Sequence, residues 1–254
     1  MFDRDVIAIL LDKVPDLRSP WRILLTVAYV LLLGTLCALF FFAVDRLAWF
    51  TPILSQAAMA LLAALIAHLH FKWVAGYRRR YGLLAYRYYF YHLILPYLVT
   101  WYACFFHPLF VSGPPLLPVW LAIALGLILL LLFLLASIHI ERAGFSTMTY
   151  GMDLYTVFPE EAPPVYGEIY GYVRHPLYFS LICGSLGLAF FRNNGLALLV
   201  SSLQLIPALT AAHLEDREMI EREGQTHRQY VQRTSAIVPL RRLGGFLKLL
   251  FFLG

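Results

Sequence analysis

The stretch VWLAIALGLILLLLFLLASIHI, residues 119–140, decides the fold class of this chain. It contains no Asp, Glu, Lys or Arg, and a helix of about 20 apolar residues crosses a hydrocarbon core about 30 Å thick. The whole chain has the same character: 61% of its 254 residues are hydrophobic, 14% are charged, and its mean hydropathy is +0.71. Soluble domains carry about 25% charged residues. The sequence therefore predicts a polytopic membrane protein.

Five further apolar runs flank this segment, so we predict an all-α transmembrane bundle of about six spans. The additional spans cover approximately 23–44, 53–71, 88–111, 177–191 and 196–214. The run 88–111 is rich in Tyr and includes His92, Pro96 and His107, which is typical of a kinked helix facing other helices or a cavity.

The last two runs are short and are separated by Arg192-Asn193-Asn194-Gly195, a sequence that favours a tight helical hairpin. We expect Gly184 and Gly187 to let the two helices of this hairpin approach each other closely. We also expect Pro207 to kink the second helix, because proline lacks the N–H group that a helix interior needs.

Basic residues are distributed unevenly along the chain. With six spans, 18 of the 20 Lys and Arg residues lie on the side that carries both termini, and the other side has only Arg46 and Arg192. Short cytoplasmic loops of membrane proteins are enriched in Lys and Arg. We therefore expect both termini, the basic segment 72–87, and the polar segments 141–176 and 215–240 to be cytoplasmic. The membrane is an inner membrane or the endoplasmic reticulum, depending on the organism.

The polar segment before the predicted hairpin ends in YGEIYGYVRHPLY, residues 166–178. Arg174 and His175 precede Pro176, which sits at a favoured first position of a helix. The free N–H groups of a helix start, together with a guanidinium, suit a carboxylate or a phosphate. Taken alone, the triplet fits a contact with lipid headgroups at least as well.

The residues around this triplet form a longer pattern. Gly167, Tyr170, the Arg-His-Pro triplet and Tyr178 are followed by the hairpin, and then by Glu215, Asp216, Gly224, Tyr230 and Pro239. In this spacing, residues 141–240 resemble the membrane methyltransferases typified by isoprenylcysteine carboxyl methyltransferase and the phosphatidylethanolamine methyltransferases. Residues 1–118 carry no comparable pattern. The resemblance implies an integral membrane methyltransferase that uses S-adenosylmethionine.

The resemblance also implies a set of site residues. It assigns cofactor binding to Pro164, Val165, Tyr170, His175, Pro176, Leu177, Tyr178 and Glu215, with the loop 162–165 closing over the cofactor. It assigns a catalytic role to Arg142, as an arginine facing the reacting group. Arg174 is the second predicted catalytic residue, because its guanidinium suits the cofactor carboxylate. The chain departs from the family pattern at Pro163-Pro164, Gly171, Asp216 and His227. No metal site is predicted, because His68 and His70 lack a third ligand nearby.

The predicted partners are membrane lipids and a lipophilic methyl acceptor, such as an isoprenylcysteine carboxylate or a phospholipid amine; a small volatile thiol also remains open. No nucleic acid is expected. The chain then divides into an amphipathic N-terminal segment (1–22), a four-span acceptor-side bundle (23–140), a methyltransferase core (141–240) and an interfacial tail (241–254).

Two alternative functions compete with a methyltransferase. Membrane sterol reductases, which use NADPH, look related in their last helices, but the proline after His175 favours a methyltransferase. A non-catalytic membrane protein that shares the fold is the other alternative, and the complete set of His175, Tyr178 and Glu215 argues against it.

Overall fold

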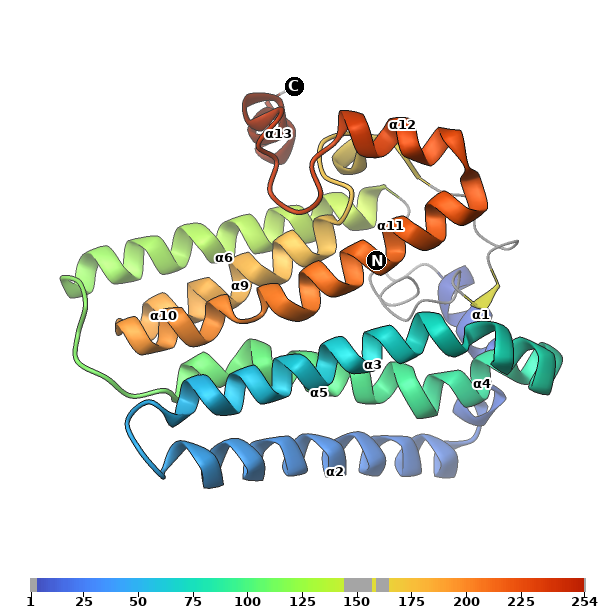
Figure 1. The fold of residues 1–254 in the computed structure, drawn as a ribbon, viewed down its shortest axis with the longest axis horizontal. Coiled ribbons are helices and arrows are strands. Elements are labelled where there is room, and N and C mark those ends of the chain that lie inside the picture. The colour runs from blue at the N-terminus through green and yellow to red at the C-terminus, as the bar shows by residue number, and fades with distance from the viewer. Residues whose placement is uncertain (1–3, 144–156, 159–164, 254) are drawn as a thin grey trace.

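The computed structural model describes residues 4–143, 157–158 and 165–253, and in these ranges it is helical, with two isolated β-bridges and no sheet. Long helices lie side by side along the longest axis of the molecule (Figure 1). Their bounds are α2 Pro20–Asp45, α3 Thr51–Tyr81, α5 Leu95–Phe106, α6 Val119–Arg142, α9 Pro176–Arg192, α10 Gly195–Ser202 and α11 Leu205–Glu223. The predicted all-α class is confirmed.

Four helical stretches are long and apolar enough to cross a membrane: Pro20–Asp45, Thr51–Phe110, Val119–Arg142 and Gly195–Glu223. The second stretch includes both α3 and, after a turn at Gly82–Leu84, the helix that runs back through α5. Pro176–Arg192 is a shorter apolar helix. The chain is thus a multi-pass integral membrane protein, whereas the count of six crossings stays a prediction.

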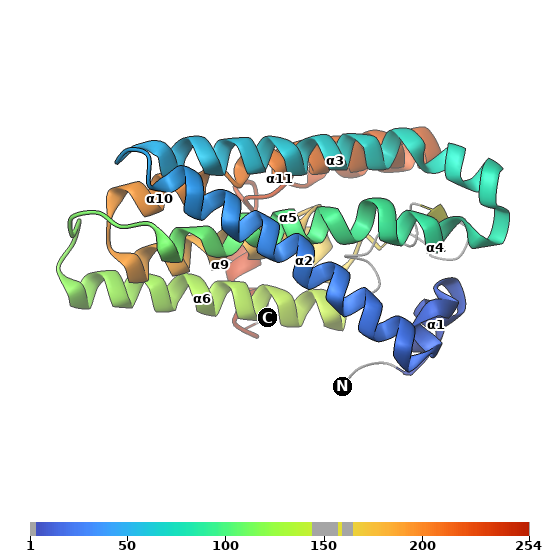
Figure 2. The same ribbon diagram turned by 90° about the horizontal axis from the view of Figure 1, so that it is seen from below.

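Helix packing places the sequence-distant spans next to one another. Helix α6 packs along α9, and α11 packs along α3, as the two views in Figures 1 and 2 show. Helix α5 contacts α2, α3 and α9. The last two spans, which carry the family-like pattern, therefore lie directly against the first spans, which do not.

The third predicted span is irregular, as its composition suggests. It begins with α4 (Ala85–Tyr89), continues as a π-helix over Phe90–Ile94, and then becomes α5 with Pro96 in its first turn. Proline and π-helical turns are two of the recognised causes of helix bending. The hairpin between α9 and α10 is also present, because α9 ends at Asn193 with φ +51° and the Asn194 side chain caps α10 by accepting from the Ala197 N–H at 2.7 Å.

Pro207 lies three residues after the break between α10 and α11, in agreement with the expected kink. The expectation for the two glycines is corrected, however. A Cβ on Gly187 would lie 3.1 Å from the Gly126 carbonyl oxygen of α6, and one on Gly184 would lie 2.8 Å from the Phe105 ring of α5. The glycines therefore allow close packing of α9 on α6 and α5, not on its hairpin partner.

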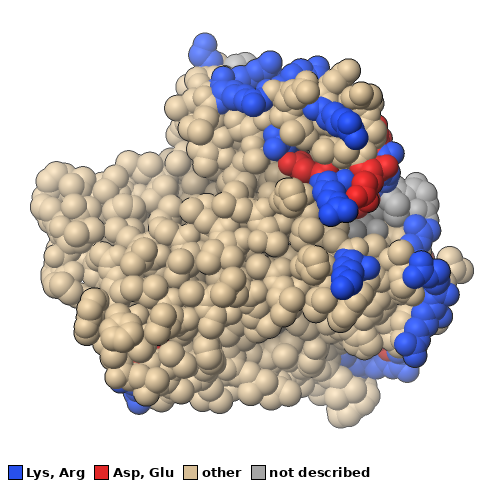
Figure 3. Space-filling view, in the orientation of Figure 1, with Lys and Arg blue, Asp and Glu red and all other residues tan. Residues whose placement is uncertain are grey.

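Charge separates the two ends of the bundle. Lys and Arg side chains gather at the end that carries α12 (Gln225–Arg233), while the flank of the long helices is almost uncharged apart from a basic patch at the lower left (Figure 3). The last turn of α3 contributes Arg78, Arg79 and Arg80 to the basic end. The exposed flank is apolar, with aliphatic and aromatic side chains, as a lipid-facing surface requires.

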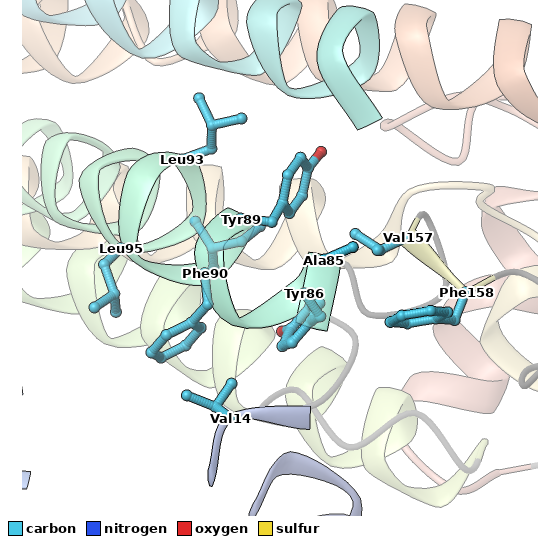
Figure 4. Close-up of a cluster of buried hydrophobic side chains, with 10 residues drawn as sticks. Val14, Ala85, Tyr86, Tyr89, Phe90, Leu93, Leu95, Val157 and Phe158 are labelled. Carbon is cyan, nitrogen blue, oxygen red and sulfur yellow. The ribbon is translucent and has the colours of Figure 1, made fainter. Parts of the chain in front are cut away.

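Both terminal segments pack against the basic end. The N-terminal segment forms α1 (Arg4–Lys13) and a 3-10 turn, Pro15–Arg18, and places Val14 against Tyr86 and Phe90 (Figure 4). In the C-terminal segment, α13 (Leu243–Leu250) buries Phe246 and Leu250 against α6. The predicted interfacial tail thus has one face on the protein. The division into four segments stays a prediction.

Candidate active site

The Arg-His-Pro triplet begins α9 and is joined through its backbone to the segment that follows α12. His175 is the residue before the helix, and Pro176 is its first residue, as predicted. The N–H groups of Arg174 and His175 donate to the carbonyl oxygens of Ser235 at 2.9 Å and Ala236 at 3.0 Å. The chain reaches this position because Gly224, with φ +59°, separates α11 from α12. Glycine adopts this left-handed conformation without a Cβ clash.

Glu215 of α11 connects the two halves of the predicted site. Nδ1 of His175 lies 2.8 Å from Oε2 of Glu215, and the Tyr178 hydroxyl donates to Oε1 of the same carboxylate. His175 and Tyr178 are three residues apart and therefore share a side at the start of α9. The structure thus brings together three of the predicted cofactor residues, which come from two separate parts of the sequence.

Arg174 is held entirely by groups of the protein. Its Nε donates to both carboxylate oxygens of Asp216 at 3.1 and 3.2 Å, and its Nη2 lies 2.9 Å from Oδ2 of the same residue. Its Nη1 donates to the carbonyl oxygens of Val231 at 3.1 Å and Thr234 at 2.7 Å. All three nitrogens of the guanidinium are therefore engaged. This geometry favours a role for Arg174 in holding α11 and the tail in place, and the predicted catalytic role stays untested.

Two of the departures from the family pattern contact each other. Nε2 of His227 makes a hydrogen bond of 3.2 Å with Oδ1 of Asp216, and both side chains are largely buried. In the sequence, Asp216 and His227 stand out only as differences from the family pattern, and neither has a predicted role. Both positions differ from the family pattern in the same chain, and residues in contact tend to vary together. This joint difference is the signal that could have indicated the pair.

The electrostatic environment of His175 favours a positive charge. Burial alone would lower the pKa of His175, but contacts with the carboxylates of Asp216 and Glu215 outweigh burial and raise this pKa to about 9. The imidazole is therefore protonated at neutral pH. In that state it donates to Glu215 and has no free electron pair with which to accept a proton.

An aromatic stack extends the site onto α5. The Trp101 ring lies nearly parallel to the Tyr178 ring, at 5.3 Å between centroids and 16°, and Tyr178 is likewise stacked with His175 at 5.7 Å and 20°. Sequence reasoning missed Trp101, which belongs to the part of the chain without a recognisable pattern. The aromatic content of the third span was the available signal.

The other predicted residues lie around this cluster. The Tyr170 carbonyl oxygen accepts from the Tyr230 hydroxyl at 2.6 Å, Pro176 is buried, and Leu177 and Val165 are half-buried. Pro164 and the rest of the predicted closing loop lie outside the described residues. The Arg142 side chain is exposed at the end of α6, with its guanidinium carbon 5.1 Å from the centre of the Phe252 ring.

Several buried polar atoms near the cluster have no hydrogen-bond partner among the described residues. Nε2 of His175 is one, because its 3.2 Å approach to Asp216 Oδ1 is not aligned as a hydrogen bond; Nδ1 of His227 and the Tyr166 hydroxyl are the others. An unsatisfied buried polar group costs about 1–3 kcal/mol. Such groups beside a carboxylate fit a ligand with several polar groups, as S-adenosylmethionine has.

Comparison with known proteins shows what one segment of the chain is similar to. Residues 121–222 match the family model for phospholipid methyltransferases. This segment contains Arg142, the Arg-His-Pro triplet, the hairpin and Glu215, so the resemblance found in the sequence is confirmed over these residues. Methyltransferases of the family use S-adenosylmethionine.

One curated relative is methanethiol S-methyltransferase 1 of Bradyrhizobium diazoefficiens, which is 31% identical over 109 residues. The aligned region covers 41% of this chain and 35% of the relative, so the two proteins share only a part of their lengths. No solved structure matches the chain.

Proposed function

We propose that this chain is an integral membrane methyltransferase that transfers a methyl group from S-adenosylmethionine to a lipophilic acceptor. The contact of His175 and Tyr178 with Glu215 carries the proposal, because it joins the two separated motifs inside the segment that matches the phospholipid methyltransferase family. No contact among the described residues of the cluster supports an NADPH-dependent reductase as specifically as this contact supports a methyltransferase.

The residues in and around the cluster would hold the cofactor in distinct ways. Glu215 presents a carboxylate to the ribose or the ammonium group, and Val165, Tyr170 and Leu177 line the site. When bound, S-adenosylmethionine supplies an electrophilic methyl group on a sulfonium. His175 fixes the Glu215 carboxylate, while Arg174 and Asp216 fix the tail against α9. Methyl transfer mainly requires positioning and the exclusion of water.

The acceptor chemistry follows from the protonation of His175. Because this imidazole is already charged at neutral pH, it does not act as a general base, and an amine acceptor would need another residue, such as Glu218 or His213, in that role. An acceptor that is anionic when it reacts, such as a carboxylate or a thiolate, needs no base. We therefore favour a carboxylate or thiol acceptor over an amine. The relative named for methanethiol makes a small thiol the second candidate.

The topology of the proposal has six crossings, with α3, the α4–α5 helix and α9 each counted separately, and with the active site at the cytoplasmic surface. The concentration of 18 of the 20 basic residues on the side of the termini supports this orientation. Cytoplasmic placement lets the soluble cofactor reach the site from water while a lipophilic acceptor arrives from the bilayer.

Calorimetric titration of the detergent-purified protein tests the cofactor. We expect S-adenosylmethionine to bind with a micromolar dissociation constant and NADPH to show no binding. Binding of NADPH alone would replace the proposal with a reductase, and binding of neither would favour a non-catalytic membrane protein.

A transfer assay with methyl-labelled cofactor tests the acceptor. We would supply methanethiol, N-acetyl-S-farnesylcysteine and phosphatidylethanolamine vesicles in parallel. The proposal predicts transfer to the farnesylated carboxylate in preference to the other two. Transfer to phosphatidylethanolamine alone would contradict the preference for a carboxylate or thiol acceptor.

A further inference from the structure

A groove with a volume of about 470 Å³ lies between α2, α3 and α5, in the part of the chain that the family model does not cover. Its walls are almost entirely apolar, with Thr100 as the one hydroxyl-bearing side chain. The lining residues are Leu33, Leu36, Cys37, Phe40, Ala58, Met59, Leu62, Ile66, Pro96, Val99 and Thr100.

The groove opens on the lipid-facing flank of the bundle. Leu36 and Leu62, which line it, also have 54% and 43% of their surface exposed. Along α2 it extends from Leu33 to Phe40, or about 10 Å at 1.5 Å per residue. Both helices are membrane-spanning, so the surroundings of this opening are hydrocarbon chains. The occupant that such a groove accepts is therefore a hydrocarbon chain entering sideways.

One end of the groove adjoins the candidate active site. Ile66 lines the groove and also packs against the buried cluster that contains Trp101 and Tyr178. On α5, Thr100 lines the groove and the next residue, Trp101, stacks on Tyr178. Tyr178 in turn donates to Glu215. A chain in the groove thus ends within a few side chains of the predicted cofactor residues.

Trp101 offers a polar group at this junction. Its ring is 3% exposed, and its indole N–H has no hydrogen-bond partner among the described residues. Buried indole N–H groups usually find an acceptor. A ligand that places an oxygen or sulfur atom beside Trp101 would supply one.

We propose that the groove binds the hydrocarbon tail of the methyl acceptor, and that the Trp101 N–H donates to its polar head. The acceptor class is then a single-chain lipid with a carboxylate or thiol head. That the bound chain belongs to a methyl acceptor rests on the proposed function. The binding of a hydrocarbon chain in the groove can be tested without the cofactor.

The test is photo-crosslinking of the purified protein with a farnesylcysteine that carries a diazirine in its prenyl chain, followed by peptide mapping. We expect labelling of 33–40 and 58–66. The variant Ala58→Trp, which fills the distal end of the groove, should lower the yield at least fivefold. Ala38→Trp is the matched control, since Ala38 is exposed on α2 outside the groove, and it should leave the yield unchanged.

Competition separates the acceptor tail from ordinary membrane lipid. Unlabelled farnesylcysteine should displace the probe, and phosphatidylcholine at equal excess should not. Equal displacement by phosphatidylcholine, labelling spread over all exposed spans, or full yield in Ala58→Trp would overturn the proposal. Groove labelling in a protein that binds no S-adenosylmethionine would overturn the proposed function instead and leave the groove a chain-binding site.

Discussion

The bundle contains two buried histidine–carboxylate clusters, one around His107 and one around His175. At the first, Nε2 of His107 lies 2.7 Å from Asp45 Oδ2, and Nδ1 lies 2.9 Å from Gln56 Oε1. Ser55 donates to the other Asp45 oxygen at 2.5 Å, and the Gln56 amide donates to the Cys104 carbonyl at 3.2 Å. Both nitrogens of this imidazole are satisfied.

The second cluster has the same chemistry but is incomplete. His175 uses Nδ1 on Glu215, and its Nε2 lies 3.2 Å from Asp216 Oδ1 in an ion pair that is not aligned as a hydrogen bond. Nδ1 of His227 has no hydrogen-bond partner among the described residues. The His107 imidazole needs no further partner, and its contacts with Asp45 and Gln56, together with the bond from Gln56 to Cys104, tie α2, α3 and α5 together. An incomplete buried network needs another explanation, and a bound ligand is the one that fits here. We therefore regard the cluster around His175, which has buried polar atoms without a hydrogen-bond partner, as the functional one of the two.

The largest expected effect comes from removing the carboxylate at the incomplete cluster. Glu215→Gln keeps the size of the side chain but not its charge, so S-adenosylmethionine should bind at least about 100-fold more weakly, or about 2.7 kcal/mol. Glu221→Gln on the same helix is the control, because Glu221 only pairs with Arg217 at the surface. Calorimetric titration measures both. Equal affinities in the two variants would remove Glu215 from the site.

The complete cluster should respond in the opposite way. Asp45→Ala leaves His107 and Ser55 buried with a lost partner, which we expect to cost about 1–3 kcal/mol of stability. The affinity for S-adenosylmethionine should stay unchanged. Thermal unfolding in detergent, followed by the titration, tests the two parts. A large loss of affinity for S-adenosylmethionine at unchanged stability would instead assign ligand binding to the His107 cluster and contradict the comparison.

Arg174→Lys should weaken cofactor binding by about tenfold. Lysine keeps the charge that pairs with Asp216 but lacks the planar donors that also bind Val231 and Thr234. The tail should then loosen, so protease cleavage after α12 should accelerate in parallel with the loss of affinity. Weaker binding without faster cleavage would instead indicate that Arg174 contacts the cofactor directly.

The charge on His175 predicts a pH dependence. Burial opposes the charge, but Asp216 and Glu215 raise the pKa to about 9 from an ordinary 6.5. A raised histidine pKa stabilises the folded state fully below pH 6.5, and this stabilisation is lost as the pH rises through 9. The unfolding temperature of the wild type should therefore fall between pH 6.5 and 9, and that of His175→Gln should fall less. Parallel curves would show that His175 is not charged.

The aromatic stack should affect the acceptor and leave the cofactor unaffected. Trp101→Phe keeps a ring on Tyr178 but removes the indole N–H. The KM for a methyl acceptor that the wild type methylates should rise about tenfold, while the affinity for S-adenosylmethionine stays unchanged. Tyr102→Phe, at the exposed neighbouring position, is the control. A change in cofactor affinity rather than in KM would place Trp101 on the cofactor side.

The sequence was sufficient to predict those parts of the site that depend on short motifs and their spacing. The spacing from His175 and Tyr178 to Glu215 was readable as a pattern, and Asn193, Asn194 and Gly224 mark their turns through backbone chemistry. Apolar runs of sufficient length predicted the helical bundle. These features depend on residues that are close together in the sequence and on regular helix geometry, so they can be predicted from residue patterns.

The remainder depends on packing between distant segments. Trp101 reaches Tyr178 across 77 positions of sequence, and no pattern in residues 1–118 indicates that contact. The guanidinium of Arg174 looked available for a ligand until Asp216, Val231 and Thr234 were seen to occupy it. Likewise, Gly184 and Gly187 predicted a close helix approach, but only the fold shows that its partners are α5 and α6.

The most direct test of the central claim is a cryo-electron microscopy structure of the protein with S-adenosylhomocysteine added. The account predicts ligand density at the His175 cluster, within hydrogen-bond distance of Glu215, while His107 keeps its contacts with Asp45 and Gln56. Ligand density at another place in the bundle, with Glu215 still bound only to His175 and Tyr178, would contradict it.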